Sequence, residues 1–94
     1  MKLKGTGIAG TLESGDAMIE LSPGKNGIRI DLNSTVKSQF GKYIRKVVMD
    51  TCLEFDLQDV DVKVQDKGAL DCTIRARVTA AILRAAGGEV QYEF

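Results

Sequence analysis

The chain has 94 residues, of which 44% are hydrophobic and 28% are charged, and its 13 basic residues balance 13 acidic ones. This length suits one small domain, residues 1–94, but it is too short for a deep catalytic cleft. The zero net charge, and the lack of aromatic residues interleaved with basic ones, argue against DNA or RNA as a partner.

Residues that commonly carry chemistry are scarce, since the chain has no histidine and only two cysteines, Cys52 and Cys72. Metal ligation and histidine acid–base catalysis lose their usual residues, so we expect no metal site and no catalytic residue. Two cysteines could form a disulfide. However, neither a secretion signal nor a membrane-spanning apolar run is found, and we expect buried, reduced thiols in a cytoplasmic protein.

The first predicted element is a β-hairpin. Residues 8–12 and 17–21 alternate between apolar and polar on either side of Ser14 and Gly15. A two-residue loop at Ser14 and Gly15 puts three apolar pairs on one face: Leu12 with Ala17, Gly10 with Ile19, and Ile8 with Leu21. Ser14 then lies at the exposed tip of the hairpin, where a modifying enzyme could reach it.

A third strand and a long helix follow. Turn-forming residues 22–27 precede a strand over residues 28–33. Asn33, Ser34 and Thr35 then offer helix-capping side chains, and apolar residues recur at three- and four-residue steps from Val36 to Phe55. This periodicity predicts one amphipathic helix of about 20 residues.

The charges of this helix oppose the helix dipole. The basic residues lie toward its start and the acidic ones toward its end: Lys37, Lys42, Arg45 and Lys46, then Asp50, Glu54 and Asp56. A solvated face on which Lys46 pairs with Asp50 accounts for this order. The alternative is a basic patch that contacts a phosphate-rich ligand or an acidic partner surface.

The last third of the chain predicts a second hairpin and a short helix. Residues 59–65 and 70–78 alternate around a loop at residues 66–68, which would place Lys63 opposite Asp71 and Asp59 opposite Arg75. Alanine-rich residues 80–86 predict a short terminal helix. The expected fold is α+β in the order β-β-β-α-β-β plus that helix, with a mostly antiparallel sheet packed on the long helix.

The chemistry available to Ser14 is limited. A catalytic serine needs a general base, and the chain has no histidine and no locally placed lysine or cysteine. Glu13 and Asp16 are the residue types of an acid–base pair, but an exposed turn would not desolvate them enough for that work. From spacing alone, Ser-Gly is ordinary hairpin chemistry and the function of Ser14 stays open.

Three longer stretches of the sequence bear on the function of Ser14: AGTLESGDAMIEL at residues 9–21, NSTVKSQFG at 33–41 and DKGALDCTIRARVTAAILRA at 66–85. They closely resemble the acyl carrier protein of citrate lyase, its gamma subunit, and the resemblance covers nearly the whole chain in the expected order. It implies that the serine of the ESGD turn, here Ser14, carries 2'-(5''-phosphoribosyl)-3'-dephospho-CoA through a phosphodiester. It implies no catalytic role for the motifs at residues 66–72 and 75–77.

The resemblance also implies a mechanism and partners. The thiol of the attached group holds an acetyl; the alpha subunit, a CoA-transferase, exchanges acetate for citrate, and the beta subunit, a citryl lyase, cleaves the citryl thioester to oxaloacetate and the acetyl carrier. The carrier would be a non-catalytic subunit of a large hetero-oligomer, modified by a dedicated prosthetic-group transferase. Glu13 and Asp16 would shape the turn or help that transferase recognise it, with plain solubility as the equal alternative. The order of charges on the long helix adds the hypothesis that Lys42, Arg45 and Lys46 contact the phosphates of the arm.

Two alternatives remain open. The nearer is the acyl carrier of malonate decarboxylase, which uses the same kind of prosthetic group. The more distant is an unmodified structural or adaptor subunit whose sheet edge binds a partner.

Overall fold

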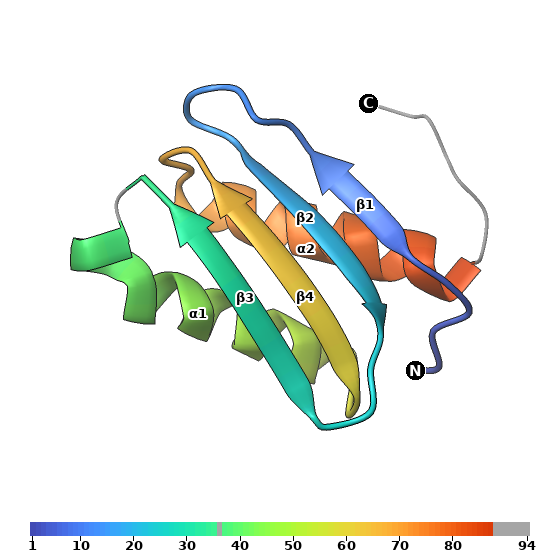
Figure 1. Ribbon diagram of the computed structural model, residues 1–94. Coiled ribbons are helices and arrows are strands. Elements are labelled where there is room, and N and C mark those ends of the chain that lie inside the picture. The colour runs from blue at the N-terminus through green and yellow to red at the C-terminus, as the bar shows by residue number, and fades with distance from the viewer. Residues whose placement is uncertain (36, 88–94) are drawn as a thin grey trace.

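A computed structural model describes residues 1–35 and 37–87. One four-stranded sheet has both helices packed on the same face, so the molecule has two layers (Figure 1). The elements in chain order are β1 (Gly7–Gly10), β2 (Ala17–Pro23), β3 (Ile28–Ser34), α1 (Lys37–Glu54), β4 (Val60–Asp66) and α2 (Asp71–Gly87). No helix in the described part of the chain is long and apolar enough to cross a membrane.

The strand order across the sheet is β1-β2-β4-β3. β2 pairs antiparallel with both β1 and β4, whereas β3 and β4 pair in parallel. A parallel pair needs a crossover connection, and α1 supplies it between β3 and β4. The α+β class and the mostly antiparallel sheet are therefore confirmed.

The long amphipathic helix is also confirmed, as α1, with 18 residues. Its buried side chains recur at three- and four-residue steps and face the sheet and α2: Ile44, Val47, Val48, Thr51 and Cys52. The hydroxyl of Thr51 donates to the carbonyl of Val47 at 2.7 Å, which satisfies the one polar group on this buried stripe. Val36, where the apolar pattern begins, lies outside the described residues.

The predicted fifth strand is wrong, because residues 71–87 form one helix, α2. Its buried residues lie three or four apart: Ile74, Val78, Ala81, Ile82 and Ala85. Cys72 and Ala76, which the alternating pattern placed in the core, are exposed. In an alternating run, residues four apart also share one face of a helix, as Ile74 and Val78 do, and the alanine-rich continuation favours the helix.

The cross-strand ion pairs expected from that hairpin are consequently absent from the described residues. Lys63 lies opposite Glu20 of β2 instead, with 3.9 Å between its Nζ and the Glu20 Oε2. Arg75 pairs with Glu54 of α1, with 2.8 Å between Nη1 and Oε1. The helix predicted at residues 80–86 is thus confirmed as the end of the longer α2, and the sheet is covered by two long helices instead of one.

The predicted register of the first hairpin is wrong by one residue. Ala9 rather than Gly10 lies opposite Ile19, and Gly7 rather than Ile8 lies opposite Leu21. Gly7 and Ala9 therefore face the helices, and Ile8 is 48% exposed. Shifting a strand by one residue exchanges its faces, and this strand turns Gly7 and Ala9 inward because α2 packs very close to it.

The thiols of the two cysteines differ in their exposure to solvent. Cys52 is buried in α1 and Cys72 is exposed near the start of α2, and both are free. The expectation of a buried thiol is confirmed for Cys52 and wrong for Cys72. The latter was assigned to the inner face of a strand that does not form.

Candidate functional site

Ser14 lies in the loop between β1 and β2, residues 11–16, so the expected two-residue hairpin loop is wrong. The amide of Asp16 donates to the carbonyl of Glu13 at 3.1 Å and closes a β-turn with Ser14 and Gly15 at its centre. Gly15 has a φ of 84°, a left-handed conformation that favours glycine. Ser14 is exposed at this turn, as the sequence predicted.

The backbone of the turn is attached to the segment that joins β4 to α2. The amide of Gly15 donates to the carbonyl of Lys67 at 2.7 Å, and the amide of Lys67 donates to the carbonyl of Asp16 at 2.9 Å. These two bonds continue the β2–β4 pairing, whose last pair is Ala17 with Asp66. The turn is thus held in place immediately beside Ser14.

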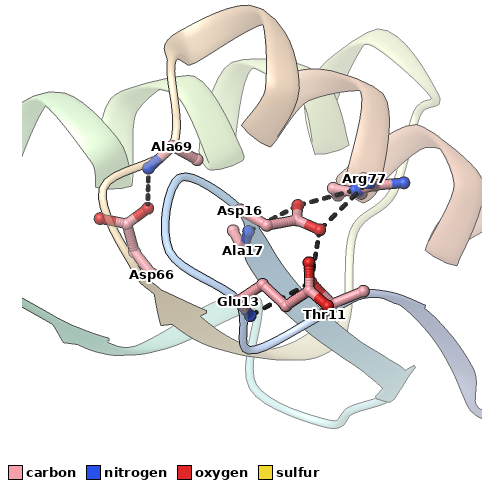
Figure 2. A network of polar contacts seen from close by, with 7 residues as sticks. All are labelled: Thr11, Glu13, Asp16, Ala17, Asp66, Ala69 and Arg77. Atoms are coloured by element: carbon pink, nitrogen blue, oxygen red, sulfur yellow. Dashed lines mark hydrogen bonds and ion pairs between the residues drawn. The ribbon is translucent and has the colours of Figure 1, made fainter.

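The carboxylate of Asp16 provides a second attachment, to α2 (Figure 2). Its Oδ1 accepts from the Ala17 amide at 2.7 Å and from Nε of Arg77 at 3.0 Å. Its Oδ2 accepts from the Thr11 hydroxyl at 2.7 Å and from Nη2 of Arg77 at 3.1 Å. The Thr11 oxygen in turn accepts from the Glu13 amide at 3.2 Å, so the network spans the loop.

These contacts change the acidity of Asp16. The hydrogen bonds from Arg77, and then those from Thr11 and Ala17, lower its pKa to about 2, although partial burial opposes them. Asp16 is therefore a carboxylate at neutral pH and a poor proton donor. We interpret it as a residue that shapes the turn, which is one of its three expected roles.

Asp66 stabilises the segment to which the turn is attached, and it is only 1% exposed. Its Oδ2 accepts from the Ser34 hydroxyl at 2.7 Å and from the Gly68 amide at 3.2 Å. Its Oδ1 accepts from the Ala69 amide at 2.9 Å (Figure 2). Asp66 thus orders the backbone between β4 and α2, which in turn holds Gly15 and Asp16.

This arrangement presents the Ser14 side chain at an exposed and ordered turn. A Cβ added to Gly15 would meet no heavy atom within 4 Å, so the space beside Ser14 is open. The chain has no histidine to act as a general base. In the described ranges, no group of three or more histidine, cysteine, aspartate or glutamate side chains could hold a metal ion. The geometry suits a residue that another protein modifies.

Comparison with known proteins identifies the family. A family model for acyl carrier proteins, described as the malonate decarboxylase delta subunit (MdcD), matches residues 4–85. The citrate lyase acyl carrier protein of Lactobacillus acidophilus is 51% identical over 90% of this chain and 88% of its own length. That of Halothermothrix orenii is 42% identical over 99% of both chains.

The chain belongs to the citrate lyase acyl carrier protein family. The relative from Streptococcus uberis is 51% identical over 93% of this chain and 86% of its own. A solved structure with a similar fold is that of a Pseudomonas malonate decarboxylase hetero-tetramer in complex with malonate. It aligns with a TM-score of 0.59 and 21% identity, over 86% of this chain and 84% of that one.

In this member of the family, two of the basic residues of α1, Arg45 and Lys46, have partners inside the protein. Nη1 of Arg45 donates to the carbonyl of Ile30 at 2.6 Å, and Nζ of Lys46 lies 2.7 Å from Oδ2 of Asp50. The Lys46–Asp50 pair is the one that the solvated-face interpretation expected. Lys42 is exposed on the same helix.

Two residues of the site were not assigned to it from the sequence. Asp66 was placed in a hairpin loop, and Arg77 was a motif residue without a role. Their contribution depends on a helix at residues 71–87, which brings Arg77 to Asp16 across 61 positions of sequence. The motif at residues 66–72 was the available signal for Asp66, because an aspartate with a glycine two residues later is typical of a side-chain-stabilised turn.

Proposed function

We propose that this chain is the acyl carrier subunit of citrate lyase and that Ser14 is the residue that carries its prosthetic group. The observation that carries the proposal is the position of Ser14. It is exposed at the centre of a turn whose backbone and Asp16 carboxylate are both tied to the rest of the fold. The identity to citrate lyase acyl carrier proteins, up to 51%, supports the same assignment.

The residues at the turn fit a covalently attached group. A phosphodiester to the Ser14 oxygen requires an accessible hydroxyl and open space around it, and both are present. When bound, 2'-(5''-phosphoribosyl)-3'-dephospho-CoA would supply a thiol on a long flexible arm to hold the acyl group. Tethering of this kind keeps a reactant at high effective concentration for more than one active site.

The chain itself would make or break no bond of citrate. It has no histidine, and Asp16 is committed to Arg77, Thr11 and Ala17. The chemistry would belong to the alpha and beta subunits of the complex, and the dedicated transferase would attach the group in the cytoplasm. The part of this chain is to hold the Ser14 oxygen outward on an ordered turn.

The acyl carrier of malonate decarboxylase is the second candidate. It is favoured by the description of the matching family model and by the similar fold found in the Pseudomonas malonate decarboxylase structure. The sequence identity to that structure, 21%, is much lower than the 42–51% shared with citrate lyase carriers. Turnover of citrate against malonate, measured for the purified complex that contains this chain, separates the two.

The adaptor alternative requires a free sheet edge, and both edge strands are partly occupied. Nη1 of Arg84 in α2 donates to the carbonyl of Ile8 in β1 at 2.6 Å. Nη1 of Arg45 in α1 does the same for Ile30 in β3. Side chains that use the carbonyls of an edge strand work against the addition of another strand.

Mass spectrometry of the protein purified from its native, citrate-grown host tests the proposal. We expect the intact mass to exceed that of the chain by the mass of one phosphoribosyl-dephospho-CoA unit, and peptide mapping to localise it to Ser14. The variant Ser14→Ala should stay folded and unmodified. A bare Ser14 in a host whose citrate lyase is active and modified elsewhere would overturn the proposal and favour the adaptor.

A further inference from the structure

The Ser14 turn is attached to the fold in two ways that differ in kind. The backbone attachment joins Gly15 and Asp16 to Lys67 and extends the sheet. The side-chain attachment depends on Arg77, which is the only α2 residue that bonds the loop among those the structure describes. Removing Arg77 would therefore leave the sheet intact while it releases one side of the turn.

The geometry of this contact is specific to arginine. Nε and Nη2 of Arg77 donate to the two oxygens of Asp16, a bidentate arrangement that lysine cannot form. The side chains are 14% exposed for Asp16 and 40% exposed for Arg77, so the pair is partly shielded from water. A pair with this geometry orients its partner more firmly than an exposed single contact does.

Without Arg77, the Asp16 carboxylate would lose two of its four hydrogen bonds. The contacts from Thr11 and Ala17 would remain. Thr11 belongs to the loop itself and Ala17 is the first residue of β2, so neither contact reaches α2. No side-chain contact to Asp16 would then connect the turn to α2. We expect the turn to sample more conformations while Ser14 stays exposed.

We propose that Arg77 is a positioning residue for the modification of Ser14, because it holds the turn through Asp16 in the conformation that the transferase binds. The inference rests on the proposed function. If only a fraction of carrier molecules present the right turn, the apparent affinity for the transferase falls in proportion to that fraction. The rate constant for transfer of the group to Ser14 within the bound complex does not change. The expected signature is therefore a higher KM for the carrier with a similar kcat.

Arg75 offers a matched control, because it lies on the same helix and also forms an ion pair. Its partner is Glu54 of α1, with 2.8 Å between Nη1 and Oε1, and both side chains are about half exposed. The Arg75 pair links the two helices and does not contact the loop. Replacing either Arg75 or Arg77 removes an arginine ion pair from α2. Only the replacement of Arg77 also removes a contact with the turn.

The test uses full-length apo-carrier with the prosthetic-group transferase and its phosphoribosyl-dephospho-CoA donor. For Arg77→Met we expect the KM for the carrier to rise about tenfold with kcat within about twofold of wild type. Arg77→Lys should give an intermediate KM, and Arg75→Met should match wild type. In parallel, the exchange rate of the Asp16 amide, which donates to the Glu13 carbonyl and closes the turn, should rise in Arg77→Met but not in Arg75→Met when followed by NMR in the apo-proteins.

The outcomes separate the inference from the proposed function. If wild-type Ser14 accepts no group, the proposed function fails, whereas the amide exchange still reports whether Arg77 orders the turn. If wild type is modified and Arg77→Met has an unchanged KM, or if Arg75→Met shows the same rise, the inference is wrong. Should Arg77→Met fail to fold, Arg77→Lys and Asp16→Asn carry the same test, and an unchanged KM in both would overturn it.

Discussion

Gly7 of β1 lies directly against the backbone of Ala81 in α2. A Cβ at position 7 would lie 1.9 Å from the Ala81 carbonyl oxygen and 2.7 Å from the Ala85 amide nitrogen. Both are backbone atoms of a packed helix, so neither can move aside by rotating a side chain. The close packing of α2 on β1 therefore requires glycine at this position.

We expect Gly7→Ala to lower the free energy of unfolding by about 3 kcal/mol, because the helix must shift away from the strand. Urea titration followed by circular dichroism measures this. Gly5→Ala is the matched control, since a Cβ there would meet nothing within 4 Å, and its effect should stay within about 0.5 kcal/mol. Equal effects of the two variants would contradict the close packing.

Asp66 should be a major determinant of stability at the Ser14 end of the fold. Asp66→Ala would leave the Gly68 and Ala69 amides and the Ser34 hydroxyl without their common acceptor. We expect a loss of about 3 kcal/mol, measured by urea unfolding, against about 1 kcal/mol for Ser34→Ala. A loss for Asp66→Ala no larger than that for Ser34→Ala would mean that the two backbone bonds contribute nothing.

Asp16 should make stability depend on pH in the acid range. Its pKa is about 2 in the folded protein against 3.8 for the unperturbed group, so the unfolded chain binds a proton first as the pH falls. Its contribution to stability is complete above about pH 4 and is lost as the pH falls through 2. The free-energy difference between wild type and Asp16→Asn, measured from pH 6 to pH 2, should therefore be constant at first and then shrink. A difference that is independent of pH would contradict the Arg77 contact.

The two cysteines should react at very different rates. Burial raises the pKa of the Cys52 thiol to about 11, whereas Cys72 is exposed. At pH 8 we expect iodoacetamide to label Cys72 quickly and Cys52 only after denaturation, because the thiolate is the reactive form. Cys72→Ser should abolish the fast labelling measured by mass spectrometry. Fast labelling of Cys52 in the folded protein would contradict its position in the core.

Local patterns of the sequence were sufficient for several features. The three- and four-residue spacing of apolar residues predicted α1, and the alternation of residues 17–21 and 28–33 predicted two strands. The turn at Ser14 followed from glycine beside serine between two alternating segments. These features depend on periodicity and turn chemistry within a few residues.

Two local patterns were ambiguous. Leu70, Cys72, Ile74, Ala76 and Val78 alternate as in a strand, but Ile74 and Val78 are also one helical turn apart, and they are buried on that helix. In β1, the large side chain of Ile8 led to the prediction that Ile8 faces the core, whereas Gly7 and Ala9 do so in the structure. Burial of the larger residue is the usual preference, and the proximity of α2 reversed it at Gly7 and Ala9.

The sequence by itself determined the α+β class, the long helix and an exposed serine in a turn, because each depends on residues near one another in the chain. Only the tertiary structure decided that β4 pairs with β2 and β3, and that Arg77 reaches Asp16 across 61 positions. The strand pairing depends on segments far apart in the chain meeting in one sheet, and the Arg77 contact depends on how α2 packs against that sheet. Local periodicity cannot predict a contact between residues as far apart in the chain as Arg77 and Asp16. The attachment of the Ser14 turn to α2 is therefore visible only in the folded chain.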